Sequence, residues 1–315
     1  MSVQQSSIQH DDSYTLQKAY HKLQKHHPDI AIPTDISQRV NISHALPYKV
    51  IHQQTLFVDI YQPKAQKGAL PLVTLIHGGA WRSGNPSIMS HLAASLALRG
   101  YVVAVPSYRL SPQAQYPAAV NDLYDALTWL IENALTFNIN QQQLVLAGSS
   151  AGGQLAALLA YSGGQLNTDQ STFSAPSCAL SNRARLPIAA LINIDGLSDF
   201  TSPEALRHEN DPNKHPSAAQ AWFGGRYQQV PQRWQQASPV YYIDENAPPT
   251  LFINGQKSRF YAGRTQAISA LTEFGNPSKI VTFPQAPHSF WLFEPWQTPT
   301  LVAMDDFLKH NLKLD

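Results

Sequence analysis

The sequence predicts an α/β fold in which a mostly parallel, doubly wound sheet carries helices on both faces. Three observations support this prediction. Short apolar runs typical of fully buried parallel strands alternate with runs of helical period from about residue 72 onward. The strand, helix, strand order favours right-handed crossovers within one sheet. The 315 residues are 43% hydrophobic, which is enough to fill a large core.

The predicted sheet belongs to one main domain over residues 46–315, preceded by an N-terminal segment of residues 1–45. Within that segment, residues 13–27 carry apolar side chains at helical spacing and Pro28 ends the run, so a short amphipathic helix should pack on the core. Residues 201–248 are rich in Pro, Gln, Asn and aromatic side chains without a sustained period. We expect them to form a cap-like insertion over the carboxyl edge of the sheet, as a wall or lid of a pocket.

The elements of the main domain follow from apolar periodicity. Alternation between Lys49 and Tyr61 predicts an early antiparallel hairpin. Buried parallel strands are predicted at 72–76, 101–105, 144–148, 187–194, 249–253 and 279–283. Helices are predicted at 88–98, 117–131, 151–160, 262–274 and 298–312, and the polar stretch 163–182 is predicted to be an exposed loop.

One strand-to-helix junction carries the pattern Gly-x-Ser-x-Gly, with Gly148, Ser150 and Gly152 at its fixed positions. In such a nucleophile elbow the serine occupies a strained turn, and the glycines leave room for backbone that would collide with a Cβ atom. The pattern alone is weak, because roughly one chain in ten of this length carries it by chance. The strand before it and the helix after it make Ser150 the predicted nucleophile and Ser149 only its neighbour.

A glycine-rich segment, His77-Gly-Gly-Ala-Trp81, follows directly on the predicted strand 72–76. Gly78 and Gly79 allow the backbone to point N–H groups into a site, where they stabilise a developing oxyanion. An ordinary tight loop is the alternative for this segment taken alone. Beside a serine elbow the oxyanion interpretation is favoured, because acyl transfer needs both parts.

His288 is the predicted general base. A serine hydroxyl is a poor nucleophile without a base in hydrogen-bond reach, and the pKa of histidine suits that task near neutral pH. His288 lies between the last predicted strand and the last helix, at the same sheet edge as Ser150, and Pro287 and aromatic residues flank it. His77 belongs to the glycine loop. Polar segments without a strand to orient them hold His10, His21, His26, His27, His208 and His215.

Composition argues against several classes of function. The net charge is +1, only 14% of residues are charged and there is no basic run. Neither nucleic acid nor an anionic membrane is therefore favoured as a partner, and small, neutral molecules are expected.

Cys178 is the single cysteine, which excludes an intramolecular disulfide and a cysteine-based metal site. His21, His26 and His27 lack arranged acidic or thiol partners, so no metal site is predicted. No apolar run has the length of a signal-peptide core or a membrane span, so we expect a soluble, cytoplasmic protein.

Seven short motifs follow one another along the chain: His77-Gly-Gly-Ala-Trp81, Tyr108-Arg-Leu110, Tyr116-Pro-Ala-Ala119, Gly148-Ser-Ser-Ala-Gly-Gly153, Ile194-Asp-Gly196, Arg259-Phe-Tyr-Ala-Gly-Arg264 and Pro287-His-Ser-Phe-Trp-Leu-Phe293. In these motifs the chain, from about residue 14 to its C-terminus, resembles the α/β-hydrolase superfamily. The similarity is in particular to esterases related to hormone-sensitive lipase. It is closer still to a bacterial group of acetyl-xylan or pectin acetylesterase-like esterases.

This resemblance implies a serine carboxylesterase that works through an acyl-enzyme without a cofactor. Ser150 would be the nucleophile and His288 the base, and the backbone N–H groups of Gly78, Gly79 and Ala151 would form the oxyanion hole. Short-chain acyl esters, acetyl esters among them, or acetylated carbohydrates would be the substrates. A non-catalytic binding protein on the same fold is the alternative. A serine peptidase is disfavoured, because about 50 residues ahead of the core leave no room for a peptide-gating domain.

The catalytic acid departs from the family pattern. Its commonest position lies a few residues after the strand that ends at Asn254-Gly255, and this chain has Gln256-Lys-Ser-Arg259 there. A second expected position, just after the Ala-Gly-Arg step, holds Thr265. Neither position offers a carboxylate, so the acid must come from another element or be absent.

Asp195 is the best-placed candidate for the acid, because it follows the strand 187–194 and preserves the chain order Ser, Asp, His. Asp199, Glu294 and a Ser-His dyad without an acid are the alternatives. Asp195 would otherwise only cap the turn at Gly196, as aspartate often does. A hydrogen bond of roughly 2.6–3.2 Å between His288 Nδ1 and a carboxylate oxygen of Asp195 would favour the catalytic role.

Overall fold

The apolar runs of the sequence form the strands of an eight-stranded sheet in the computed structural model, which describes residues 12–111, 113–166, 183–213 and 216–314. The strands stand in the order β1-β2-β4-β3-β5-β6-β7-β8. They are β1 (Val40–Ile51), β2 (Gln54–Pro63), β3 (Leu70–Ile76), β4 (Val102–Pro106), β5 (Ile139–Ser149), β6 (Ile188–Ile194), β7 (Thr250–Asn254) and β8 (Ser278–Thr282).

The first strands pair antiparallel and the rest pair parallel. β2 lies antiparallel to both β1 and β4, whereas every other neighbouring pair runs parallel. The central strands are buried on both faces, as a sheet covered by helices requires. The predicted mostly parallel, doubly wound α/β fold is therefore confirmed.

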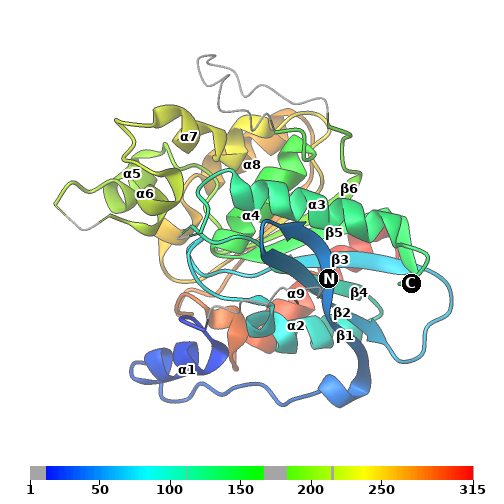
Figure 1. Cartoon of the computed structure of the whole chain (residues 1–315). Coiled ribbons are helices and arrows are strands. Elements are labelled where there is room, and N and C mark those ends of the chain that lie inside the picture. Colours follow the sequence, from blue (N-terminus) through cyan, green and yellow to red (C-terminus); the bar gives the residue numbers. More distant parts are fainter. Residues whose placement is uncertain (1–11, 112, 167–182, 214–215, 315) are drawn as a thin grey trace.

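Helices cover both faces of the sheet (Figure 1). They are α1 (Leu16–Gln24), α2 (Ser90–Ala97), α3 (Ala118–Glu132), α4 (Ala151–Ser162), α5 (Pro203–Glu209), α6 (Ala218–Phe223), α7 (Pro231–Gln236), α8 (Arg264–Glu273) and α9 (Gln297–Leu312). The core on one face contains residues of α1, α2 and α9, and the core on the other contains residues of α3, α4 and α8. Among the described residues, none of these helices has the length and apolar character needed to cross a bilayer.

The sheet begins earlier than the sequence predicted. The boundary expected between residues 45 and 46 falls inside β1, which pairs with β2 from Val40 onward. β1 is an edge strand, and its register shifts twice, between Ser43 and Leu46 and between Pro47 and Lys49. These irregularities interrupt the apolar alternation that marks a strand in a sequence, so only the second half of the hairpin was recognised.

Residues 201–248 contain three short helices, α5, α6 and α7, and a 3-10 turn at Pro239–Tyr242. None of these helices exceeds seven residues, so no sustained helical period can appear in the sequence. Most aromatic side chains of this insertion are buried, and Tyr241 is exposed. Trp222 and Trp234 are 0% exposed, and Trp222 stacks on Trp81 of the main domain with ring centroids 5.0 Å apart.

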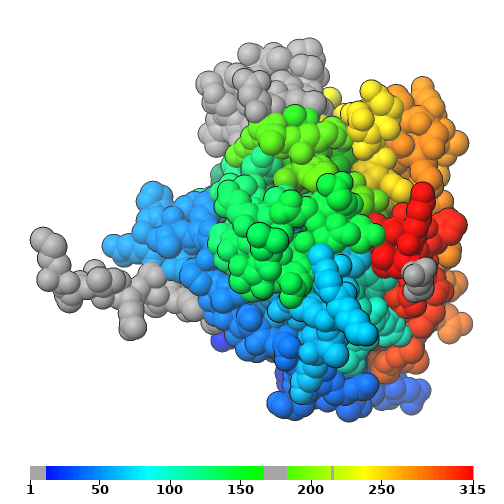
Figure 2. Space-filling view, turned by 90° about the vertical axis from the view of Figure 1, so that its right-hand side faces the viewer, coloured from blue at the N-terminus to red at the C-terminus, as the bar shows by residue number. Residues whose placement is uncertain are grey.

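The N-terminal segment packs at the opposite end of the molecule from this insertion. Figure 1 has α1 at the bottom and α5–α7 at the top, and Figure 2 likewise has the blue N-terminal residues at the bottom and the yellow insertion near the top. The α1 side chains Ala19 and Tyr20 contact the main core, and Tyr20 lies against Phe293 with ring centroids 5.9 Å apart. A backbone bridge between Ala31 and Glu294 fixes the chain that follows α1.

Some residues named from the sequence lie outside the described part of the chain. These are Cys178, His10, His215 and most of the predicted loop 163–182.

Candidate active site

Ser150 occupies the sharp turn between β5 and α4. Its backbone has φ 54° and ψ −122°, a conformation that non-glycine residues rarely adopt. The turn fits only because its neighbours are small. A Cβ atom on Gly148 would lie 2.2 Å from the Gly152 carbonyl oxygen, and one on Gly152 would lie 2.2 Å from that of Ile76. The Gly-x-Ser-x-Gly pattern thus presents the Ser150 side chain at the carboxyl edge of the sheet.

His288 connects Ser150 to an aspartate through hydrogen bonds. Its Nε2 lies 2.9 Å from Ser150 Oγ, and its Nδ1 lies 3.0 Å from Asp195 Oδ2. Since a carboxylate only accepts, Nδ1 carries the proton and donates to Asp195, which leaves Nε2 to accept from the Ser150 hydroxyl. The hydrogen bond that the sequence led us to expect between His288 and Asp195 is therefore present.

Asp195 directly follows β6 and is 2% exposed. Its Oδ1 accepts the backbone N–H of Gly255 at 2.8 Å, so both carboxylate oxygens have partners. The turn at Gly196 is capped by a different side chain. Asn193 accepts the Gly196 N–H at 2.7 Å and donates to the Gly196 carbonyl at 3.1 Å. Asn193 thus takes the capping role considered for Asp195, and Asp195 is available to His288.

The other carboxylates considered for the acid have local roles. Asp199 Oδ1 accepts from the backbone N–H and the hydroxyl of Thr201, both at 2.7 Å. Glu294 accepts from the backbone N–H and the hydroxyl of Thr298 in the first turn of α9. Neither of them has a hydrogen bond or an ion pair with His288.

Aromatic side chains enclose the His288 imidazole. Phe260 stacks on it with ring centroids 3.5 Å apart and nearly parallel planes, and Trp291 meets it edge-on at 5.1 Å. Burial lowers the pKa of His288, the hydrogen bond and charge of Asp195 oppose this, and the charges of Arg259 and Lys257 lower it further. The net pKa lies below the ordinary value, so the imidazole is neutral at pH 7 and able to accept a proton.

The glycine loop after β3 lies against the serine turn. A Cβ atom on Gly78 would be 3.1 Å from that of Ser150, so the loop backbone and the Ser150 side chain are in direct contact. Within the described part of the chain, the backbone N–H groups of Gly78, Gly79 and Ala151 donate to no protein acceptor. These donors are therefore available to an oxygen atom bound beside Ser150.

His77 has a positioning role that its sequence context did not reveal. It is buried, stacks on Tyr108 with ring centroids 4.5 Å apart, and its Nδ1 lies 2.7 Å from the Gly78 carbonyl oxygen. Because a trans peptide directs its N–H opposite to its C=O, fixing the Gly78 carbonyl also fixes the direction of the Gly79 N–H. A histidine immediately before two glycines was the signal, but only the fold shows which carbonyl it holds.

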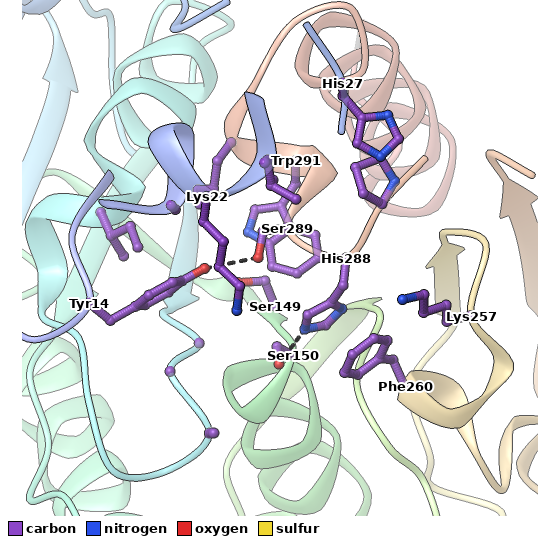
Figure 3. Close-up of a pocket in the computed structure, with 18 of the residues that line it drawn as sticks. Tyr14, Lys22, His27, Ser149, Ser150, Lys257, Phe260, His288, Ser289 and Trp291 are labelled. Carbon is purple, nitrogen blue, oxygen red and sulfur yellow. Dashed lines mark hydrogen bonds between the residues drawn. The ribbon is translucent and has the colours of Figure 1, made fainter. Parts of the chain in front are cut away.

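A cavity of about 760 Å³ opens over Ser150 and His288 (Figure 3). Residues 14–27, the glycine loop, the segment 256–260 and the loop around His288 line it. Tyr14 closes one side, and its hydroxyl lies 2.9 Å from Ser289 Oγ. The expectation that residues 201–248 form a wall of the pocket is wrong for this cavity, because none of its lining residues within the described chain belongs to them. Trp222, Phe223, Trp234 and Tyr242 of this segment pack into the core instead.

Ser149 and the histidines add no second reactive centre. The Ser149 side chain is fully buried, and its hydroxyl faces the sulfur of Met89 at 3.8 Å. His26 and His27 line the cavity. Across the described ranges, no group of three His, Cys, Asp or Glu side chains is arranged to hold a metal ion.

The chain is similar in sequence to known hydrolases and esterases. The BD-FAE family model matches residues 58–262. An AB hydrolase superfamily protein of Schizosaccharomyces pombe is 29% identical over 237 residues, which cover 73% of this chain and 66% of that protein. Esterase LipC of Mycobacterium tuberculosis is 27% identical over 260 residues, covering 76% of this chain and 58% of LipC. The chain thus spans less than two thirds of each relative.

Solved structures share the fold. A truncated carbohydrate esterase from gut microbiota has a TM-score of 0.73 at 20% identity, covering 89% of this chain and 99% of that one. The propionate-bound esterase 2 of Thermogutta terrifontis has a TM-score of 0.66 at 22% identity, with 88% and 96% covered.

Proposed function

This chain belongs to the BD-FAE family and has the α/β-hydrolase fold, and on that premise we propose that it is a serine carboxylesterase. One observation carries the proposal. An unbroken chain of hydrogen bonds runs from Asp195 through His288 to Ser150, at a strained turn beside unpaired backbone N–H groups. A charged acceptor, an imidazole and a hydroxyl in this order are the parts that acyl transfer requires.

In the proposed reaction, Ser150 Oγ attacks the ester carbonyl carbon while His288 Nε2 takes the hydroxyl proton. The N–H groups of Gly78, Gly79 and Ala151 stabilise the resulting oxyanion. Collapse of the intermediate breaks the bond to the alcohol, and His288 returns the proton to the leaving oxygen. A water molecule, deprotonated by His288, then attacks the acyl-enzyme, and Ser150 regains its proton as the carboxylic acid leaves. Asp195 holds the imidazole in the required tautomer throughout.

Short acyl groups, acetyl among them, are the proposed substrates. The cavity as a whole supports small polar esters over lipid-like ones, because the basic side chains of Lys22, Lys25, Lys257 and Arg259 are among its lining residues. Burying a long hydrocarbon chain against charged groups would remove water from them without compensation. Acetylated carbohydrates remain within this proposal as small acetyl esters.

The alternative, a non-catalytic binding protein, arose because no carboxylate stands at the usual position of the acid. Asp195, directly after β6, supplies a carboxylate in hydrogen-bond contact with His288, and this supports the catalytic proposal over that alternative.

Labelling with a fluorophosphonate probe, run beside hydrolysis of p-nitrophenyl acetate and palmitate, tests the proposal. Wild-type protein should be labelled and should hydrolyse acetate faster than palmitate. Ser150→Ala should lose labelling and hydrolysis, whereas the matched control Ser149→Ala should keep both. Labelling of Ser150→Ala together with an inactive Ser149→Ala would show that the nucleophile is assigned to the wrong serine.

A further inference from the structure

The cavity over Ser150 and His288 has a strongly positive lining. Four basic side chains take part in it: Lys22 and Lys25 from α1 and its C-terminal end, and Lys257 and Arg259 from the segment after β7. No Asp or Glu is among its lining residues in the described chain. Since the whole protein has a net charge of only +1, this positive charge is a local concentration rather than a general property of the surface.

These four cations have no acidic partners. Within the described ranges, no carboxylate lies in ion-pair distance of any of them. Glu204 approaches the same segment, but it accepts a hydrogen bond from Ser258 between the two basic residues. Unpaired like charges around one cavity repel each other, and an anion bound between them would relieve that repulsion.

Two of the cations extend toward the reacting groups. Figure 3 shows the Lys22 and Lys257 side chains directed from opposite sides toward Ser150 and His288. Arg259 is held close to the same site, because its guanidinium lies over the Phe260 ring at 4.4 Å and Phe260 stacks on His288. The influence of Lys257 and Arg259 on the pKa of His288 is consistent with this proximity.

The chemistry decides which part of an ester meets these cations. His288 Nε2 must hand its proton to the leaving oxygen, so the alcohol part of the ester lies on the His288 side of Ser150. The carbonyl oxygen lies on the side of the glycine loop, where the free N–H groups are. Lys257 and Arg259, which flank the ring stacked on His288, therefore face the leaving alcohol.

We propose that the preferred substrate is a short-chain ester whose alcohol part carries a carboxylate, bound by Lys257 and Arg259, while Lys22 and Lys25 add to the positive potential of the same cavity. This inference rests on the esterase function proposed above and specifies its substrate class. It also replaces the expectation of a neutral partner, which came from the charge of the whole chain and not from the charge around the site.

Three acetyl esters whose phenol parts differ in charge provide the test: 3-acetoxybenzoate, the neutral 3-acetoxybenzamide and the cationic 3-acetoxyphenyltrimethylammonium. We expect kcat/KM for the anion to exceed that for the neutral ester by at least about tenfold at low ionic strength, with the cation slowest. The preference should shrink as sodium chloride is added, because salt screens charges at an open cavity.

Variants locate the effect. Lys22→Gln with Lys257→Gln should lower the ratio of anionic to neutral kcat/KM by about fivefold or more. The matched control, Lys67→Gln with Lys279→Gln, removes two exposed lysines that do not line the cavity and should leave the ratio unchanged. Lys22→Glu with Lys257→Glu should shift the preference toward the cationic ester, a gain that misfolding cannot produce.

The outcomes separate this inference from the esterase function. Hydrolysis of all three esters at similar kcat/KM would reject the inference and leave the esterase intact. Hydrolysis of none, with no fluorophosphonate labelling, would reject the esterase function itself. Monophenyl glutarate and its terminal amide carry the charge difference on the acyl part. If that pair showed an anionic preference as large as the acetoxybenzoate pair, the assignment of the cations to the alcohol side would be wrong.

Discussion

Residues 201–248 and the N-terminal residues 14–27 lie at opposite ends of the molecule (Figure 1), and the N-terminal residues, not the insertion, line the cavity. Residues 201–248 looked like a lid, yet Trp222, Phe223 and Trp234 pack into the core of the sheet face that α3 and α4 cover. The short N-terminal helix α1 was expected only to pack on the core, yet side chains of residues 14–27 also line the cavity at Ser150 (Figure 3). Aromatic content therefore indicates burial, but it does not indicate whether a residue is buried in a core or in a pocket wall.

The largest expected effect contrasts two aspartates, one at the site and one at the start of the insertion. Asp195→Asn removes the charge that holds the His288 tautomer, so kcat should fall by up to about 10⁴-fold. Asp199→Asn alters only the turn at Thr201 and should cost about 0.5–1.5 kcal/mol of unfolding free energy, with kcat retained. Initial rates on p-nitrophenyl acetate and urea unfolding measure both. Equal kcat for Asp195→Asn and wild type would remove Asp195 from the mechanism.

Trp222→Ala tests the insertion as part of the core. Loss of this fully buried ring, which stacks on Trp81, should lower the free energy of unfolding by about 3–5 kcal/mol. Denaturant unfolding gives this value, and titration of active sites with a fluorophosphonate corrects kcat for the folded fraction. If instead the unfolding free energy were unchanged and the acyl-length preference were altered, the insertion would be a pocket wall after all.

The pH dependence of kcat/KM tests whether the cavity cations or those of the insertion affect the pKa of His288. Because the pKa of His288 is lowered, the acid limb of kcat/KM should lie below the ordinary histidine pKa of about 6.5. Arg259→Gln removes a cation that lowers this pKa, so the limb should move to higher pH. The matched control in the insertion, Arg226→Gln, should not move it. A limb that shifts equally in both variants would mean that the cavity cations are not specifically coupled to His288.

The same lowered pKa has a consequence for stability. Between the folded and unfolded pKa values of His288, the unfolded chain binds more protons, so the free energy of unfolding rises with pH. Stability should therefore fall as pH drops below about 6.5, and this fall should end once pH passes the folded pKa. His288→Gln should remove this part of the pH dependence, which unfolding measurements between pH 5 and pH 8 would detect.

The smallest expected effect concerns the attachment of the N-terminal segment. Tyr14→Phe removes the hydroxyl that bonds to Ser289 beside His288 and should cost about 0.5–1.5 kcal/mol. Because Tyr14 also lines the cavity, its substitution should change KM as well as stability. Tyr227→Phe is the control, a conservative change within the insertion, and should leave KM unchanged. A KM effect of the control as large as that of Tyr14→Phe would contradict the division between the two regions.

Local sequence was sufficient for the fold class, the strand-to-helix turn at Ser150 and the placement of His288 at the same sheet edge. Each of these depends on a signal a few residues long. Apolar runs that must be buried indicate the fold class, glycines that a strained turn requires indicate the turn, and a position directly after a strand indicates where His288 lies. The early half of β1 and the short helices α5–α7 were missed, because bulges and lengths under two turns erase the period that marks such elements.

Only the tertiary structure decided which carboxylate meets His288 and which segment lines the cavity. Asp195, Asp199 and Glu294 were all plausible by spacing, and the choice depended on Asn193 capping the Gly196 turn and on Gly255 holding the second oxygen of Asp195. Likewise, Lys22 and Lys25 line the same cavity as Lys257 and Arg259, although more than 230 residues of sequence separate the two pairs. Contacts between distant segments carry no periodic signal in the chain, because they depend on how whole layers pack rather than on local backbone preference.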